Sequence, residues 1–330
     1  PKDRYSGYID KRYSALSFFR QDSILHSSLS LDSAQTFLLK RPMFIGAKYS
    51  GGKTLVGKER MDLGYAQYGE LKVGVTSLGN RWKDIVYGMP YYGIGIGFYR
   101  FNNNHTGKPI SVYLLQGGTL RALSVRSMLK YEFNFGTSFN WKRYHPVNNP
   151  ENTIIGTPMN IYFAVNLYYS YVLSKNFDLN LGISFNHVSN GATRTPNFGV
   201  NSVTAFAELT CYFERERIAN EFNPTLRAPA YKQKRLISDI TIRSTVRQRK
   251  YDVEETGLSS PYIDKKFFVA NASYALLYMP TYKYRYGLGV DVVYDESAGA
   301  KVKKAGTRAD GSEIIEIHKT DFIDCIGVGI

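Results

Sequence analysis

The chain has few cysteines and no long run of apolar residues. Its two cysteines, Cys211 and Cys325, lie far apart and match no metal-ligand spacing, so we expect neither a disulfide framework nor a metal site. No segment approaches the ~18 consecutive apolar residues of a membrane-spanning helix, which excludes helical membrane proteins. Membrane β-barrels remain open, because their strands alternate apolar and polar residues and never form such a run.

Aromatic residues and glycine are abundant instead. Of the 330 residues, 43% are hydrophobic and 15% aromatic, with 27 tyrosines and 29 glycines, which favours strands over helices. The formal net charge is +14 at pH 7. An excess of this size indicates an anionic partner, such as nucleic acid, phospholipid or lipopolysaccharide phosphate.

Twelve segments alternate apolar and polar residues with the period of two that strands require. They lie at residues 43–49, 71–75, 92–98, 110–114, 129–141, 159–169, 177–189, 201–213, 236–246, 267–278, 282–294 and 322–330. Several keep this period for ten or more residues, whereas strands of globular proteins average ~5–6 residues. Tilted membrane strands need ~9–11 residues. The sequence therefore predicts an all-β fold, a transmembrane antiparallel β-barrel of the bacterial outer-membrane type, with about 12 strands, or 14 if further strands are missing.

The connections between these segments alternate in length. Residues 173–176 form a short connection and residues 143–156 a long one. Bacterial outer-membrane barrels have short periplasmic turns and longer outer loops, so we expect the connection at 190–200 to lie at the outer leaflet. Residues 214–234 break the alternation, and we expect them to form a cap or a junction within the barrel. Two parts result: an N-terminal extension, periplasmic or plug-like, at 1–39, and a β-barrel at 40–330.

The hairpin predicted at 177–213 carries the most informative residues. Its two arms flank a connection rich in Gly, Pro and Asn. The apolar face of the first arm continues into His187 and Ser189, and that of the second arm begins at Asn201. Three polar side chains are thus expected at the same end of two neighbouring strands, on the lipid-facing side. Because residues two apart on a strand start ~6–7 Å apart, a His187–Ser189 hydrogen bond should need a local bend, which Gly191 permits.

Two runs in this hairpin carry a family resemblance. The run N-H-V-S-N-G at 186–191 is followed by P-N-F-G-V-N at 196–201. Together they resemble the outer-membrane lipid A 3-O-deacylase family, the PagL-like acyloxyacyl hydrolases, over about residues 68–213. That family has a His-x-Ser-Asn element at a strand end, a Pro-Asn-x-Gly turn and an acid on the next strand. Its members are compact eight-stranded barrels, so the remaining strands of this chain would be additional.

The resemblance implies a role for each residue of the pattern. Ser189 would be the nucleophile of a serine-type ester hydrolase and His187 its general base. Asn190 and the backbone at Gly191 would stabilise the oxyanion. The substrate would be an acyl ester of lipid A or a related glycolipid, which stays in the bilayer.

The third position of the pattern departs from the family. Asn201 stands where the family has an acid. An amide can orient an imidazole but cannot compensate the charge of the imidazolium, and by analogy the loss is up to ~10⁴ in rate. Glu208 is the nearest downstream acid, but its position in the alternation points it into the barrel.

Basic residues in the presumed outer loops suggest lipid contacts. Arg194, Lys142 and Arg143 could pair with lipid phosphates there. The expected partners are lipopolysaccharide, lipid A and other outer-membrane lipids, with further outer-membrane proteins as a second class. Neither nucleic acid nor a cofactor is expected.

Three functions are compatible with these observations. The first is an integral outer-membrane hydrolase that removes an ester-linked acyl chain from lipid A or a similar glycolipid. The second is the same barrel, catalytically weak or inactive, as a structural or accessory subunit of an outer-membrane protein complex. Asn201 and the additional strands favour it. The third is a pore or transporter, although a lumen with many charged side chains would be plugged.

Overall fold

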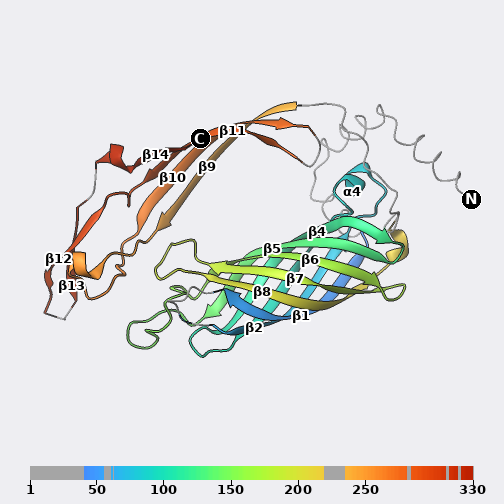
Figure 1. The fold of residues 1–330 in the computed structure, drawn as a ribbon, viewed down its shortest axis with the longest axis horizontal. Helices are drawn as coiled ribbons and strands as arrows, with labels where there is room; N and C mark the ends of the chain where they lie inside the picture. Colours follow the sequence, from blue (N-terminus) through green and yellow to red (C-terminus); the bar gives the residue numbers. More distant parts are fainter. Residues whose placement is uncertain are drawn as a thin grey trace, which may run out of the picture. The chain divides into compact units, whose positions relative to one another are not determined.

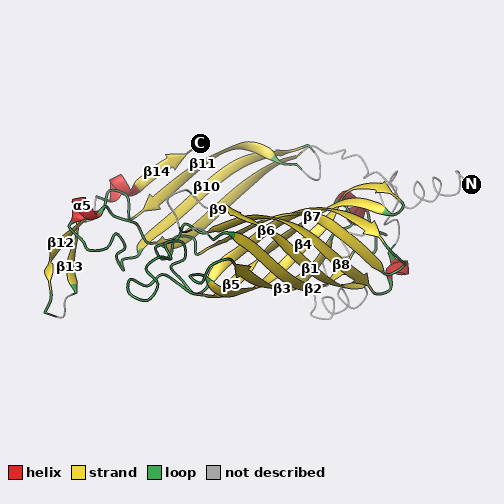
Figure 2. Cartoon of the chain, turned by 60° about the horizontal axis from the view of Figure 1, so that its bottom comes forward, coloured by secondary structure: helices red, strands yellow, loops and turns green. Residues whose placement is uncertain are grey.

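The computed structural model describes residues 41–55, 61, 63–218, 235–280, 284–309, 312–318 and 321–329. The predicted N-terminal extension at 1–39 lies outside this part of the chain. The described residues form strands joined by loops and a few short helices (Figures 1 and 2). The helices are α4 (Trp82–Val86), η1 (Arg215–Arg217), α5 (Val253–Thr256) and η2 (Phe322–Cys325). Within the described ranges, no helix has the length and apolarity needed to cross a membrane.

Eight consecutive strands close into an antiparallel barrel (Figure 1). They are β1 (Met43–Leu55), β2 (Tyr65–Thr76), β3 (Tyr91–Phe101), β4 (Gly107–Ser124), β5 (Ser127–Trp141), β6 (Asn160–Val172), β7 (Phe177–Ser189) and β8 (Val200–Tyr212). Each strand pairs with its neighbour in the sequence, and β8 pairs back onto β1, where Lys48 lies opposite Glu208. The strands have 11 to 18 residues, the lengths that the long alternating segments predicted.

The barrel has eight strands, so the prediction of about 12 strands in one barrel over residues 40–330 was wrong. The additional strands form two separate sheets. A four-stranded sheet has the order β14-β11-β10-β9, with β9 (Arg235–Arg247), β10 (Phe267–Met279), β11 (Tyr286–Asp295) and β14 (Ile326–Gly329). A two-stranded sheet consists of β12 (Lys301–Thr307) and β13 (Glu313–His318), within residues expected to form a loop. Alternation predicts strands but not which strand closes onto which, and this is why the count failed.

The interior of the barrel is filled with polar and charged side chains. The charged ones that are buried there are Lys48, Glu70, Lys72, Lys130, Glu132, Asp178, Glu208 and Arg215. Lys72 bridges Glu132 at 2.6 Å and Glu208 at 2.8 Å. The other ion pairs are Lys48–Glu70 at 2.9 Å and Arg215–Asp178 at 2.6 Å. Because the interior of an eight-stranded barrel is just wide enough for side chains to fill, this packing argues against a pore.

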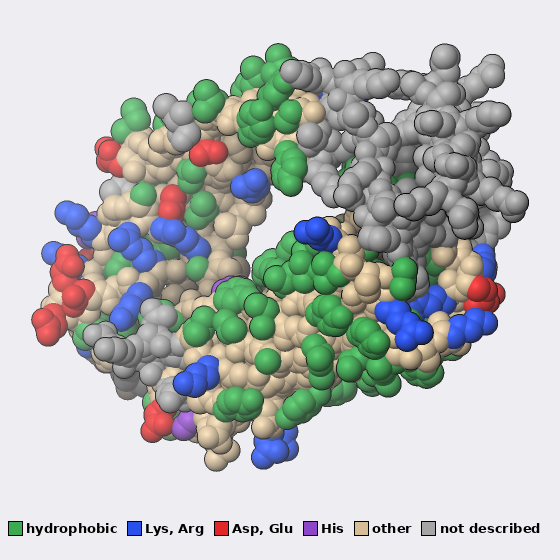
Figure 3. Space-filling model, turned by 45° about the vertical axis from the view of Figure 1, so that its right-hand side comes forward, with side chains coloured by type: hydrophobic (Ala, Val, Ile, Leu, Met, Phe, Trp, Pro, Cys, Tyr) green, Lys and Arg blue, Asp and Glu red, His purple; other side chains and the backbone are tan. Residues whose placement is uncertain are grey.

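The outward face of the barrel is apolar along most of its height. Its exposed residues include Ile45, Leu71, Ile94, Leu114, Phe135, Leu167, Leu181, Ile183 and Leu209. Figure 3 shows hydrophobic side chains gathered in a broad band on the visible face. Polar-in and apolar-out alternation on every strand is the pattern of membrane barrels.

The two ends of the barrel differ in their connections. At one end β4 and β5 are joined by residues 125–126, and β6 and β7 by residues 173–176, whereas β2 and β3 are joined there by residues 77–90, which include α4. At the other end the connections are residues 102–106, 142–159 and 190–199. The second end, called the loop end below, carries the candidate site.

Candidate active site

The structure brings His187, Ser189 and Asn201 together on the outward face at the loop end. His187 Nε2 lies 2.9 Å from Ser189 Oγ. His187 Nδ1 lies 2.7 Å from Asn201 Oδ1. All three side chains are partly exposed. The imidazole therefore has a hydroxyl on one nitrogen and an amide oxygen on the other, the arrangement that a nucleophile, its base and an orienting group require.

The strand ladder explains why these side chains meet. His187 and Asn201 are directly paired across β7 and β8. β7 continues regularly to Ser189, which pairs with Ile161 on β6. The bend expected near Gly191 is therefore unnecessary, because the imidazole is long enough to reach a side chain two residues further along the same face.

The amide of Asn201 fixes the roles of the two ring nitrogens. Its oxygen can only accept a hydrogen bond, so His187 Nδ1 carries the proton that it donates. Nε2 is then unprotonated and can accept the proton of the Ser189 hydroxyl. Glu208 does not replace the missing acid. Its side chain is buried in the lumen, where the carboxylate forms an ion pair with Lys72, as its position in the alternation predicted.

Asn190 is placed differently from what the resemblance implies. Its side chain is buried, and its Nδ2 donates to Arg194 O at 2.8 Å and Thr157 Oγ1 at 3.3 Å. These bonds occupy both amide hydrogens. The Asn190 side chain therefore holds the loop together, and assigning it to an oxyanion has no support in this geometry.

Two other donors of the site loop are not occupied by hydrogen bonds within the described residues. The backbone N–H of Asn190 donates to Asn197 Oδ1 at 3.0 Å, which fixes the orientation of the Asn197 amide. Asn197 Nδ2 makes no hydrogen bond within the described residues, and neither does the backbone N–H of Gly191. Asn197 lies in the Pro-Asn-x-Gly run that carries the family resemblance, but the sequence alone indicated no role for it.

Gly199 completes the turn that brings the second arm back to the site. Its φ is +70°, a conformation that glycine adopts readily and other residues adopt at a cost. A Cβ at this position would lie 3.3 Å from both Ser189 Cβ and His187 Cε1. The absence of a side chain here therefore leaves the room that the two functional side chains occupy.

The site loop at 190–199 is held by contacts with two other segments. Phe198 N donates to Ile154 O at 3.1 Å, in the long loop that follows β5. Gln248, which follows β9, donates from its backbone N–H to Ala192 O at 2.7 Å. Its side-chain oxygen accepts from Thr195 N, also at 2.7 Å. Residues remote in the sequence thus fix the conformation of the site loop.

The predicted phosphate-binding residues lie in different loops. Arg194 is exposed in the site loop. Lys142 and Arg143 are exposed after β5, and Lys142 Nζ lies 3.5 Å from Asn104 O in the loop between β3 and β4. Within the described part of the chain, no group of His, Cys, Asp and Glu side chains could hold a metal ion.

His187, Ser189 and Asn201 are called the triad below. Apolar side chains continue from the triad along the outward face of the barrel. Phe185 and Val203 are cross-strand partners one step below His187 and Asn201, and both are exposed. Ile161, beside Ser189 on β6, is also exposed. The outward face therefore offers an apolar surface that begins directly beside His187, Ser189 and Asn201.

Both folded parts of the chain match known families. Residues 67–210 match the family described as lipid A 3-O-deacylase (PagL), and residues 246–329 match the acyloxyacyl hydrolase C-terminal domain. No curated protein matches the chain. Two of the solved structures that are similar to the chain are a surface protein and an outer-membrane enzyme. Neisserial surface protein A (NspA) is 14% identical with a TM-score of 0.37, over 52% of this chain and 97% of its own. The outer membrane enzyme PagL is 13% identical with a TM-score of 0.35, over 49% and 97%.

The first family match contains His187, Ser189 and Asn201 and spans nearly the segment on which the sequence resemblance rests. The resemblance is therefore confirmed. The second match begins at the end of β9 and reaches β14, so it covers the strands β10 to β14 beyond the barrel. The barrel segment is therefore similar to the lipid A 3-O-deacylase (PagL) family, and the segment after it to the acyloxyacyl hydrolase C-terminal domain.

Proposed function

We propose that the protein is an integral outer-membrane ester hydrolase that removes an acyl chain from lipid A or a related glycolipid at the outer leaflet. The observation that carries this proposal is the His187 geometry, with Ser189 Oγ at 2.9 Å on one nitrogen and Asn201 Oδ1 at 2.7 Å on the other. The site faces outward at the end of an apolar surface, where a lipid ester can reach it without leaving the bilayer.

The reaction follows the chemistry of serine hydrolases. Ser189 Oγ attacks the ester carbonyl carbon while His187 Nε2 takes the hydroxyl proton. The oxyanion that forms accepts hydrogen bonds from the Gly191 N–H and the Asn197 amide. Collapse breaks the ester bond, and His187 returns the proton to the departing sugar hydroxyl. Water, activated by the same imidazole, then releases the fatty acid from Ser189.

Asn201 sets the expected rate. It holds the imidazole in the productive tautomer, but it carries no negative charge to stabilise the imidazolium that forms during attack. We therefore expect slow turnover. The same substitution favours the second candidate function, a barrel without activity that serves as an accessory subunit of an outer-membrane complex.

One experiment separates the two functions. Purified protein is incubated with lipid A, and the products are compared by mass spectrometry with those of Ser189→Ala and of Ser174→Ala, a control at the opposite end of the barrel. We expect loss of an acyl chain with the parent and the control, and a rate at least about 10³-fold lower with Ser189→Ala. Identical masses for all three proteins would overturn the hydrolase and leave the accessory function.

A further inference from the structure

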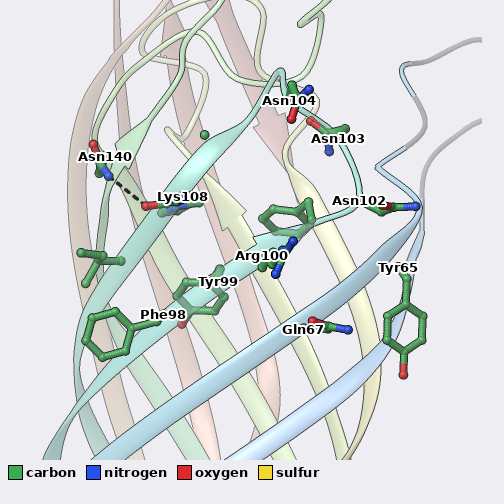
Figure 4. A pocket seen from close by; sticks show the side chains of 14 residues that line it. Tyr65, Gln67, Phe98, Tyr99, Arg100, Asn102, Asn103, Asn104, Lys108 and Asn140 are labelled. Atoms are coloured by element: carbon green, nitrogen blue, oxygen red, sulfur yellow. Dashed lines mark hydrogen bonds between the residues drawn. The ribbon is translucent and has the colours of Figure 1, made fainter.

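A groove of about 1260 Å³ lies over β2, β3, β4 and β5 at the loop end of the barrel. Side chains from all four strands and from the loop at 102–106 line it (Figure 4). The barrel order places β3 and β4 three strands away from β8 and β7, so this groove lies on the other side of the barrel from the triad.

The groove has a row of polar side chains at a single level. Gln67 on β2 is directly paired with Arg100 on β3. Lys108 lies on the next strand, and Asn140 on β5 donates from Nδ2 to Lys108 O at 2.9 Å. Figure 4 shows these four side chains on successive strands. The row brings two cations and two amides onto the outward face.

Among the described residues that line the groove, no acid balances these cations. The residues lining the groove include Arg100 and Lys108 but no Asp or Glu. Both cations are exposed, and neither side chain has an ion pair or hydrogen-bond partner within the described residues. Lys142, which reaches Asn104 at the rim, adds a third positive charge.

The loop above the row contributes an unpaired donor. Asn103 Oδ1 accepts hydrogen bonds from the backbone N–H groups of His105 and Thr106 and from the Thr106 hydroxyl. These contacts fix the amide, and its Nδ2 has no hydrogen-bond partner. Because this nitrogen is buried, an anion in the groove would meet the exposed donors of the strands first.

The surface directly below the row is apolar. Phe98 is paired with Ile110 one step below Arg100 and Lys108, and Phe98 is 48% exposed. Further down the same face Val112 and Leu114 are exposed. The groove therefore combines a cationic, donor-rich upper part with an apolar lower part, at the level where the apolar band of the barrel ends.

We propose that this groove binds a phosphorylated lipid, with its phosphate on Arg100 and Lys108 and its acyl chains along Phe98 and Ile110. Arg and Lys side chains form charge-assisted hydrogen bonds with phosphate oxygens, and Arg can do so through two parallel bonds. A lipid held here is a different molecule from one at Ser189, so this site neither requires nor reports hydrolysis.

The test measures lipid retained on the purified barrel. Protein in detergent is mixed with phosphatidylglycerol, and bound lipid is counted by native mass spectrometry. The parent is compared with Arg100→Gln/Lys108→Gln, and with Arg121→Gln/Arg126→Gln, which removes two exposed cations from the opposite end. All proteins also carry Ser189→Ala, so that the outcome is independent of hydrolysis.

We expect the Arg100→Gln/Lys108→Gln variant to bind at least about tenfold more weakly than the parent, and the control pair to bind like the parent. Equal binding by all three proteins, or equal losses in both variants, would overturn the proposal. Displacement of the lipid by millimolar inorganic phosphate would also overturn it, because the site would then recognise free phosphate. Unchanged gel mobility of the folded variants shows that the barrel is intact.

Discussion

Polar side chains occupy two regions of the barrel, the lumen and the outward face at the loop end. In the lumen the carboxylates have cationic partners inside the protein, as Glu132 and Glu208 have in Lys72. On the outward face, Arg100 and Lys108 have no such partners among the residues that the structure describes, and the Ser189–His187 pair is partly exposed. The charges of the lumen are thus paired within the barrel, whereas the polar groups on its outward face remain accessible to molecules outside it.

The largest effect is expected on stability, from removing the shared cation of the ion pairs in the lumen. Lys72→Met leaves two buried carboxylates without their shared cation, and we expect the free energy of unfolding to fall by about 3–5 kcal/mol. Urea denaturation followed by gel mobility measures this change. Lys53→Met, which removes an exposed cation from β1, serves as the control and should change stability little. Similar stability for both variants would show that the lumen pairs do not hold the barrel together.

A smaller effect, in the opposite direction, is expected at the triad. Asn201→Asp keeps the size of the side chain and adds a negative charge that stabilises the imidazolium formed during attack. We therefore expect the hydrolysis rate to rise by about 10²-fold. Asn201→Ala, which removes the orienting oxygen, should lower it. Initial rates of fatty acid release from lipid A measure both. A rate for the Asp variant at or below that of the parent would show that the missing charge does not limit the reaction.

The smallest effect is expected at the turn behind the triad. Gly199→Ala places an alanine at a φ of +70°, which is strained for any residue with a side chain, and adds a Cβ close to His187 and Ser189. We expect the hydrolysis rate to fall about tenfold. Gly257→Ala is a matched control away from the site, since its φ of +69° carries similar strain and its Cβ would meet only Lys304 Cβ, at 3.9 Å. Equal losses in the two variants would assign the effect to backbone strain alone.

The faces of the strands could be predicted from the sequence, because side chains alternate strictly along a strand. The outward positions of His187, Ser189 and Asn201 and the inward position of Glu208 all follow from this period of two. Barrel closure could not be predicted, since β1 and β8 look no different in sequence from strands that remain in an open sheet. The β12–β13 hairpin was missed because residues 301–304 are mostly lysine and show no clear alternation.

The site was predicted only in part, because some roles depend on how loops fold. The partners of the Asn190 side chain, Thr157 and Arg194, cannot be inferred from the H-V-S-N run. The same holds for the contact of Gln248 with Thr195, which joins residues 53 positions apart. A motif identified the functional residue types, but the hydrogen bonds of the folded loop decide which amide is available to a substrate.

The charges buried in the barrel have a consequence for the response of the protein to salt. Among the described residues, four cations and four carboxylates are buried there, so their formal charges cancel and the excess of +14 lies outside these eight side chains. Mobile ions screen exposed charges over ~8 Å at physiological ionic strength but reach buried pairs much less. Raising the salt concentration should therefore weaken attachment to anionic surfaces while the barrel itself stays folded.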